Sequence, residues 1–326
     1  MKAIAQDRYG DAGVLTLQDI DPPAPGAGEV LVRVKAAGAD PGVWHMMTGV
    51  PYLMRVIGFG FRRPKVPVRG LALAGVVAAR GPGATRFRPG DEVFGTCRSG
   101  SFAEYATARE DRLAAKPPTI TFEQAAALPV SGITALQAVR DQAGVTAGQR
   151  VLITGAGGGI GTFAVQLARE RGARVTGVCG PAKADLVRSI GAGEVIDYTR
   201  TEIDAGGATY DVIIDIAGSR PLGLLRRALA PRGTLVLTGG DRYDHPVVTG
   251  MSRQLRALFL SVVTAQRLRT FIAKEKAADL QTLARLAEDG AVTPVIDRAY
   301  PLEDAAEAIR NIARGHATGK GVVTVS

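Results

Sequence analysis

Short apolar runs separated by turn residues fill the first part of the chain, residues 1–121. Four of them are "EVLVRVKAAG", "LALAGVVAARG", "DEVFGTC" and "SFAEYATA". Apolar and polar positions alternate in these runs, and alternation bounded by Gly and Pro is typical of short antiparallel strands. The segments "APGAGEVLV" and "RFRPGDEVFG" also place Pro or Gly just before a strand, where a turn is needed. We therefore predict a small barrel-like β domain.

The pattern changes after "KPP", where Thr121 is expected to cap a helix. Near-continuous Val, Ile and Leu runs then alternate with amphipathic stretches. The expected strands are "RVLIT", "RVTGV", "EVIDY", "YDVIIDIAG" and "GTLVLTGG", and the expected helices are "GIGTFAVQLARERG", "AKADLVRSIG" and "PLGLLRRALA". Strands of this composition are expected where helices cover both faces of a parallel sheet. This region predicts a doubly wound α/β domain.

The segment "MSRQLRALFLSVVTAQRLRTFIAKEK" is both apolar and basic. We interpret it as a helix followed by an edge strand, packed on the fold or on a second subunit. An amphipathic helix lying on a membrane surface is the alternative. The tail from "VTPVIDRAY" to the end predicts a strand, a helix and a last strand. The acids of "PLEDAAEAI" stand at the start of that helix, where they complement its dipole.

Length and cysteine content narrow the classes of protein. The 326 residues suggest about two domains, at roughly 150 residues each. The two cysteines, Cys97 and Cys179, are far apart, which excludes a disulfide framework and a four-thiolate zinc site. We expect both to be small buried residues. The start of the chain has no apolar signal core and no run reaches about 18 apolar residues, so we expect a cytoplasmic protein without a membrane span.

The net charge of +9 comes from 40 Lys and Arg against 31 Asp and Glu. Nucleic-acid binding is one interpretation of this charge. The basic residues are scattered along the chain, however, and no RRM, KH or zinc-finger signature accompanies them. We therefore expect no nucleic-acid partner. A positive potential also favours an anionic dinucleotide.

The stretch "VLITGAGGGIG" joins an expected strand to an expected helix. Gly155, Gly158 and Gly161 would let the backbone approach a pyrophosphate, and the amides from Gly158 to Ile160 would point at the anion. The same letters also fit the TGxxxGIG loop of short-chain dehydrogenases. Those enzymes need a Tyr and a Lys four residues apart, and none of the seven Tyr residues has that Lys. The short-chain interpretation fails.

The whole chain resembles the zinc-independent quinone oxidoreductases of the medium-chain dehydrogenase/reductase superfamily. The resemblance rests on "GEVLVRVKAAGADP", "GLALAGVVAARGPGATRFRPGDEVFG", "SFAEYA", "AAALPVSGITALQAV", "GAGGGIGTFAVQLAR", "IGAGEVIDY" and "GKGVVTV", in this order. It implies a GroES-like catalytic domain from residues 1–121 and 274–326, with a Rossmann NADP-binding domain of residues 122–273 inserted. It also implies a homodimer.

Zinc enzymes of this superfamily hold the metal by Cys and His. Here the first ligand position carries Asp40, the second falls in Gly70-Leu71-Ala72, and the third region, "ALPVSGITA", has neither ligand type. We predict no catalytic zinc. Without a metal to stabilise an alkoxide, reduction of a substrate that carries its own electron sink is favoured.

A Rossmann site selective for NAD places a carboxylate after its second strand, on the ribose 2′-hydroxyl. From Arg171 to Ala184 this chain has none, so nothing repels a 2′-phosphate. Gly180 gives room and Lys183 supplies charge. In the resembling family, a Lys at the position of Lys183 and the Tyr at Tyr198 contact the phosphate. A solvated helix-surface Lys is the alternative for Lys183.

The remaining candidates follow from the resemblance. Asp40 replaces a family Asn near the nicotinamide. It is expected either to accept a hydrogen bond from ribose or substrate, or to cap the turn before Pro41. Tyr52 is expected to donate a hydrogen bond to a carbonyl or enolate. His45 is a possible proton relay or an ordinary core or surface residue. The apolar and basic segment 53–66 is expected to roof a hydrophobic substrate pocket.

The expected catalytic residues are thus Tyr52 and Asp40, with no metal. The expected NADP(H)-binding residues are Thr134, Gly155, Gly157, Gly158, Gly159, Ile160, Gly180, Lys183, Tyr198, Ala217, Gly218, Thr238, Gly239, Gly240 and Lys320.

We predict an NADPH-dependent reductase of a quinone or an activated C=C bond (enone). A carbonyl or enoyl-thioester reductase on the same scaffold is one alternative. A cofactor-binding protein with little turnover, acting through RNA or protein partners, is the other.

Overall fold

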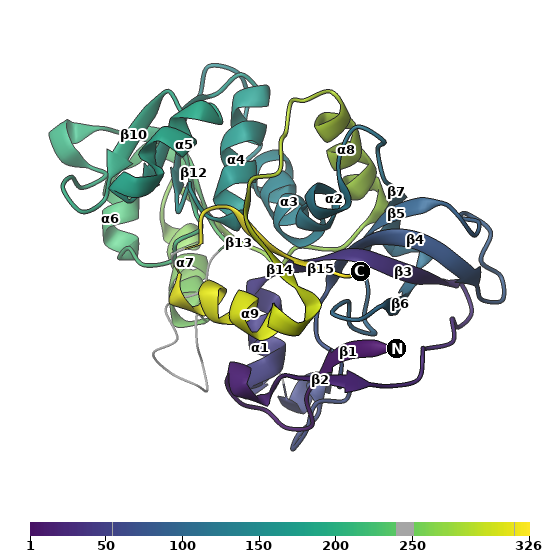
Figure 1. The fold of residues 1–326 in the computed structure, drawn as a ribbon. Coiled ribbons are helices and arrows are strands. Elements are labelled where there is room, and N and C mark those ends of the chain that lie inside the picture. Colours follow the sequence, from purple (N-terminus) through teal and green to yellow (C-terminus); the bar gives the residue numbers. More distant parts are fainter. Residues whose placement is uncertain (54, 239–250, 316) are drawn as a thin grey trace. The chain divides into compact units, whose positions relative to one another are not determined.

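A computed structural model describes residues 1–53, 55–238, 251–315 and 317–326 (Figure 1). The chain forms two compact units, Met1–Ile133 with Glu275–Ser326, and Thr134–Lys274. Residues 122–133 therefore group with the first unit, because helix α2 (Phe122–Ala127) packs on strands β3 (Glu29–Ala39) and β4 (Ala72–Arg80) of that unit. The boundary itself falls inside α3 (Pro129–Gln137).

The first unit is built on a sheet whose strand order, among the described residues, is β14-β15-β3-β4-β5-β7, with β6 also paired to β3. The four apolar runs predicted as strands are confirmed, and β3 pairs antiparallel with both β4 and β6, as β4 does with β5. A separate antiparallel pair joins β1 (Lys2–Ala5) and β2 (Thr16–Asp19). The other strands are β5 (Glu92–Thr96), β6 (Tyr105–Arg109), β7 (Leu113–Ala115), β14 (Ile296–Pro301) and β15 (Lys320–Thr324).

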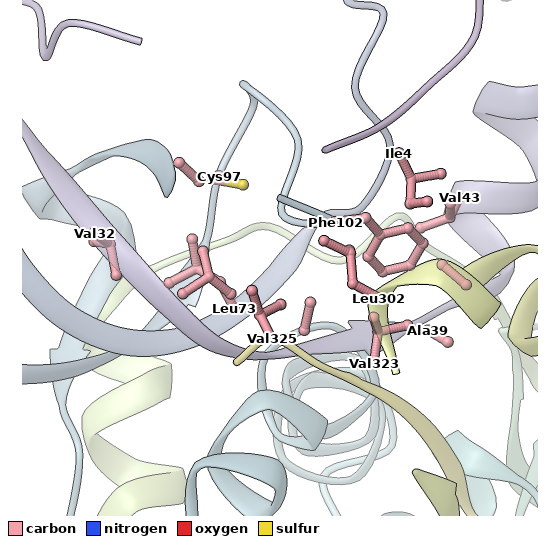
Figure 2. Packing of buried hydrophobic residues seen from close by; sticks show 14 of the residues in the cluster. Ile4, Val32, Ala39, Val43, Leu73, Cys97, Phe102, Leu302, Val323 and Val325 are labelled. Atoms are coloured by element: carbon pink, nitrogen blue, oxygen red, sulfur yellow. The ribbon is translucent and has the colours of Figure 1, made fainter. Parts of the chain in front are cut away.

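Helices α1 (Pro41–Thr48), α2, α8 (Ala277–Glu288) and α9 (Ala305–Arg314) complete the first unit. Thr121 caps α2 as predicted: its hydroxyl accepts a hydrogen bond from the Gln124 backbone amide, and the Thr121 backbone amide donates one to Gln124 Oε1. Figure 2 shows part of the apolar core of the first unit, to which Leu73 of β4, Val323 of β15 and Phe102 belong. All three are fully buried.

The second unit holds a parallel sheet with the strand order β10-β9-β8-β11-β12-β13 in the described residues. The α/β prediction is confirmed, and β13 is an edge strand that follows helix α7, as predicted. The strands are β8 (Arg150–Thr154), β9 (Arg174–Cys179), β10 (Glu194–Asp197), β11 (Tyr210–Asp215), β12 (Leu229–Leu237) and β13 (Arg267–Thr270); the helices are α4 (Gly159–Glu170), α5 (Ala184–Ser189), α6 (Leu222–Arg227) and α7 (Met251–Val263).

The strand order changes direction between the neighbours β8 and β11. From β8 the sheet continues through β9 to β10 on one side, and from β11 it continues through β12 to β13 on the other. Open α/β sheets bind ligands beyond the carboxyl ends of their strands at such a switch point. This places the candidate cofactor site of the second unit after Thr154 and Asp215. None of the described helices combines the length and the hydropathy that crossing a bilayer requires.

Candidate functional site

The glycine loop after β8 is shaped by close backbone contacts. Gly155 has a φ of +67°, and a Cβ there would lie 3.3 Å from the Ala217 amide nitrogen. A Cβ on Gly161 would overlap the carbonyl oxygen of Gly155, so α4 packs directly on the loop. These positions need glycine because a side chain would separate the helix from the strand. The geometry fits the dinucleotide loop predicted from the sequence.

The N-terminus of α4 can bind an anion. Gly158 is its N-cap and has no side chain to bond the first amides, while no acidic residue stands in the first turn. The N–H groups of Gly159 and Ile160 belong to the set that has no intrahelical acceptor. Together with the positive end of the helix dipole they suit a pyrophosphate. Gly158, Gly159 and Ile160 therefore lie at the start of α4, and their contact with a cofactor stays a prediction.

A buried polar cluster that sequence reasoning missed lies at the carboxyl ends of β8 and β11. The Thr154 hydroxyl donates to Asp215 Oδ1 (2.6 Å) and accepts from the Ala217 amide (3.2 Å). Arg253 on α7 forms an ion pair with the other oxygen of Asp215. Its Nε and Nη1 are buried without a hydrogen-bond partner in the described residues. The cluster fixes the backbone opposite the glycine loop.

Other predicted residues of the second unit occupy the same edge of the sheet. Ala217 and Gly218 follow β11, and the Thr238 amide and hydroxyl donate to the Asp215 carbonyl oxygen (3.1 and 3.2 Å). Thr134 lies half-buried on α3 at the start of the unit. The predicted Gly239 and Gly240 lie outside the described residues.

The end of β9 brings together the residues predicted to hold a 2′-phosphate. The Lys183 side chain lies against the glycine loop, since a Cβ on Gly157 would be 2.8 Å from Lys183 Cδ. A Cβ on Gly180 would lie 3.5 Å from the Tyr198 ring, and the Lys183 amide donates to the Gly180 carbonyl (3.0 Å). Lys183 thus flanks the loop, and Tyr198, 53% exposed, flanks the turn after β9.

Asp197 is a carboxylate near this corner that the sequence reasoning passed over. It pairs in register with Cys179, at the end of the neighbouring strand. Its Oδ1 accepts hydrogen bonds from the Thr199 amide (2.9 Å) and hydroxyl (2.8 Å), and these bonds hold its pKa below the usual range. The carboxylate is therefore ionised and engaged by Thr199. Its place at the end of β10, after an apolar run, was the signal available in the sequence.

In the first unit, Asp40 and Lys320 form a buried ion pair. Strand β15 pairs antiparallel with β3, with Gly321 opposite Ala39, and this register brings Lys320 beside Asp40. The Lys320 ammonium also donates to the Ala39 carbonyl (3.0 Å), and Ser131 donates to Asp40 Oδ1 at 3.4 Å. The second oxygen of Asp40 is buried and has no hydrogen-bond partner in the described residues.

This pairing changes the expectation for Asp40. Asp40 is the N-cap of α1 by position, but its carboxylate makes no capping hydrogen bond, so the capping interpretation of the side chain is wrong. The reason is that Lys320 holds the carboxylate. Lys320, expected near the cofactor, belongs to the first unit, and its ammonium contacts Asp40 and Ala39.

Tyr52 is positioned by a cationic stack. The Arg55 guanidinium lies 4.6 Å from the centre of the Tyr52 ring and donates to the carbonyls of Gly49 (2.9 Å) and Thr48 (2.8 Å) at the end of α1. The Tyr52 side chain is 44% exposed, and its hydroxyl has no hydrogen-bond partner in the described residues. It is therefore able to donate to a ligand. His45 Nδ1 lies 2.7 Å from the Val50 carbonyl oxygen.

The positions where a catalytic zinc was sought do not suit the metal. Asp40 is held by Lys320, and Leu71 and Ala72 have no donor atom. No group of three or more His, Cys, Asp or Glu residues that could hold a metal occurs in the described part of the chain.

Both cysteines are expected to resist a chromogenic disulfide reagent at pH 8. Burial raises the pKa of the Cys97 thiol to about 11 and also raises the pKa of Cys179. Because attack needs the thiolate, which is scarce below a raised pKa, neither thiol should react until the chain unfolds. Colour release in buffer and in denaturant measures this, and rapid release from a folded thiol at pH 8 would contradict it.

Comparison with known proteins shows the fold and the family. A family described as "Alcohol dehydrogenase GroES-like domain" matches residues 26–118, and "Zinc-binding dehydrogenase" matches residues 190–323. The chloroplastic quinone-oxidoreductase QR1 of Triphysaria versicolor is 33% identical, over 99% of this chain and 98% of that protein.

Solved structures give the same result. The quinone oxidoreductase of Coxiella burnetii superposes with a TM-score of 0.87 and 26% identity, over 100% of this chain and 99% of that one. A mycobacterial protein solved with NADPH has a TM-score of 0.84 and 26% identity, over 99% and 100% of the two chains. The chain therefore belongs to the quinone oxidoreductases of the medium-chain dehydrogenase/reductase superfamily.

Proposed function

We propose that the protein is an NADPH-dependent reductase of a quinone or an activated C=C bond, working without zinc. The observation that carries the cofactor choice is the position of Lys183. Its side chain lies against Gly157 of the dinucleotide loop, and no carboxylate occurs from Arg171 to Ala184. An ammonium at this place attracts a 2′-phosphate, which NADPH has and NADH lacks. The NADPH in the mycobacterial relative supports the same choice.

The residues of the chain would bind and orient the reactants. The loop from Gly155 to Ile160 would hold the pyrophosphate, and Lys183 and Tyr198 the 2′-phosphate. When bound, NADPH supplies a hydride, which with one proton reduces a quinone to a hydroquinone and leaves NADP⁺. Tyr52 would donate a hydrogen bond to the substrate oxygen, and the proton would come from Tyr52 or from solvent.

Asp40 would contribute charge balance rather than proton transfer. Lys320 neutralises its carboxylate, so the pair adds no net charge beside a hydroquinone anion.

We also propose a homodimer and a cytoplasmic location. The related QR1 protein is named as chloroplastic, so the location of this protein has to be measured in cells. Light scattering of the purified protein gives its molar mass in solution and tests the dimer.

Lys183→Glu is expected to raise the KM for NADPH by about 10- to 100-fold, since a hydrogen bond to a charged group contributes about 1.5–3 kcal/mol. The KM for NADH should change little, because the 2′-phosphate is its only difference from NADPH. Lys276→Glu, an exposed position of the first unit, makes the same charge change and should leave both KM values unchanged. A Lys183→Glu enzyme that kept its NADPH preference would contradict the cofactor assignment.

The reaction is tested by following NADPH oxidation with quinones, enones, enoyl thioesters and aldehydes, with NADH in parallel. We expect turnover with a quinone or an enone. Turnover restricted to enoyl thioesters or aldehydes would replace the proposal with the corresponding reductase. Absence of turnover with all four, together with RNA binding that salt weakens and NADPH displaces, would favour a binding function instead.

A further inference from the structure

The segment that was expected to roof the substrate pocket carries an exposed surface in the first unit. A π-helical turn at Arg55–Phe59 and the residues after it expose large apolar side chains. Val56 is 67% exposed and Phe61 is 72% exposed. We define the apolar–basic surface by the exposed residues Leu53, Val56, Phe59, Phe61, Arg62, Arg63, Lys65 and Val66. Several large apolar side chains exposed within one short segment point to an interaction site.

Polar and aromatic groups hold this surface from beneath. The Arg55 guanidinium is stacked between Tyr9 (4.3 Å) and Tyr52 (4.6 Å). The Tyr9 hydroxyl donates to the carbonyls of Phe59 (3.0 Å) and Gly60 (2.7 Å). These contacts hold the segment in a conformation in which Val56 and Phe61 are exposed. A segment fixed with apolar side chains exposed is suited to an apolar contact outside the chain.

The surface is also strongly cationic. Residues 41–90 contain no Asp or Glu, although they include eight Arg and Lys residues. Arg62, Arg63 and Lys65 are exposed, and none of them has an ion-pair partner within the described ranges. The partner of this surface therefore has to accept apolar side chains and positive charge together.

We infer that the apolar–basic surface docks on a bilayer that contains anionic phospholipids. Interfacial segments place aromatic and aliphatic side chains at the boundary of the acyl chains and keep Arg and Lys among the headgroups. A protein partner fits less well, because the cores of protein interfaces are poor in charge and especially in Lys. A two-fold contact with a second copy would bring the uncompensated cations of both copies together.

The test is co-sedimentation of the full chain with vesicles. Wild-type protein should bind vesicles of phosphatidylcholine with phosphatidylglycerol and should not bind phosphatidylcholine alone. Arg62→Gln with Arg63→Gln should lower the partition coefficient by about 10- to 30-fold, since each Lys or Arg near such a surface contributes about 1 kcal/mol. Raised salt should also lower the partition coefficient of the wild-type protein. Val56→Ser with Phe61→Ser should abolish binding.

Matched controls separate this surface from general charge and apolar exposure. Arg80→Gln with Arg88→Gln removes the same charge elsewhere, and Ile272→Ser removes an apolar side chain that is 92% exposed in the second unit. Both should bind vesicles like wild type. Vesicle binding is measured without NADPH or quinone, and NADPH oxidation with a small water-soluble quinone should be unchanged in these two control variants.

Three results would overturn the inference. The first is no binding of wild type, or equal binding to both vesicles. The second is a dimer that Val56→Ser with Phe61→Ser dissociates in the absence of lipid, which would make the surface a contact between copies. The third is unchanged vesicle binding combined with a raised KM for the soluble quinone, which would assign the segment to the substrate pocket.

Discussion

Replacing Lys320 with Met should lower the free energy of unfolding of the first unit by about 3–5 kcal/mol, because removal of one partner leaves the other charge buried and unpaired. Asp40 is fully buried, and one of its oxygens already lacks a hydrogen-bond partner in the described residues. Without the ammonium, its carboxylate would keep only the 3.4 Å contact with Ser131. Urea unfolding followed by tryptophan fluorescence measures the loss of stability. The single Trp, Trp44, lies on α1, the helix that begins directly after Asp40.

Two variants control this experiment. Lys276→Met makes the same change at an exposed position and should alter stability by no more than about 0.5 kcal/mol. Asp40→Asn with Lys320→Met removes both charges and should be more stable than Lys320→Met alone. If Lys320→Met lowered stability no more than Lys276→Met, the buried pair would not contribute to the stability of the first unit.

Features that depend on neighbouring residues were predictable from the sequence. The strand "RVLIT" begins and ends where β8 does, at Arg150 and Thr154, because an apolar run bounded by turns needs no distant partner to define it. The capping box of Thr121 and Gln124 is equally local. The glycine loop was recognised because its φ and its close contacts can be met only by glycine at fixed spacing.

Features that depend on strand register were not predictable in the same way. Asp40 and Lys320 are 280 positions apart, and only the pairing of β15 with β3 brings them together. Arg253 reaches Asp215 from α7 across 38 positions. In each case one charge stood in a recognisable place, at the end of an apolar strand, while its partner had no local signal. An Asp at or directly after the end of a buried strand is therefore the sequence feature that predicts a cationic partner elsewhere in the chain.

The two ion pairs place comparable constraints on the two units. Asp40 directly follows β3, and Asp215 is the last residue of β11, so each carboxylate lies where a strand leads into residues expected to contact ligands. Fixing such a turn costs conformational entropy, and a paired and buried charge holds it in one geometry. Preorganised groups of this kind do not have to reorganise when a ligand binds. Loss of either pair is therefore expected to affect ligand affinity as well as stability.

Gly161→Ala is expected to weaken NADPH binding by tenfold or more. Its Cβ would overlap the Gly155 carbonyl oxygen and lie 2.8 Å from the backbone carbon of Ala156. Both obstacles are main chain, so either α4 or the loop has to move, and overpacking of this kind costs typically 1–3 kcal/mol. The displaced amides of Gly159 and Ile160 would then no longer converge on the pyrophosphate. Titration of NADPH fluorescence and thermal unfolding measure the two effects.

Gly223→Ala is the matched control. Gly223 lies in α6 of the same unit, and a Cβ there meets nothing within 4 Å. The substitution adds the same methyl group, and it should stabilise the helix by about 0.5–1 kcal/mol and leave the NADPH affinity unchanged. If Gly161→Ala bound NADPH as tightly as Gly223→Ala does, the contact between α4 and the glycine loop would not be needed to hold the dinucleotide, and the site would have to rest on Lys183 and Tyr198 alone.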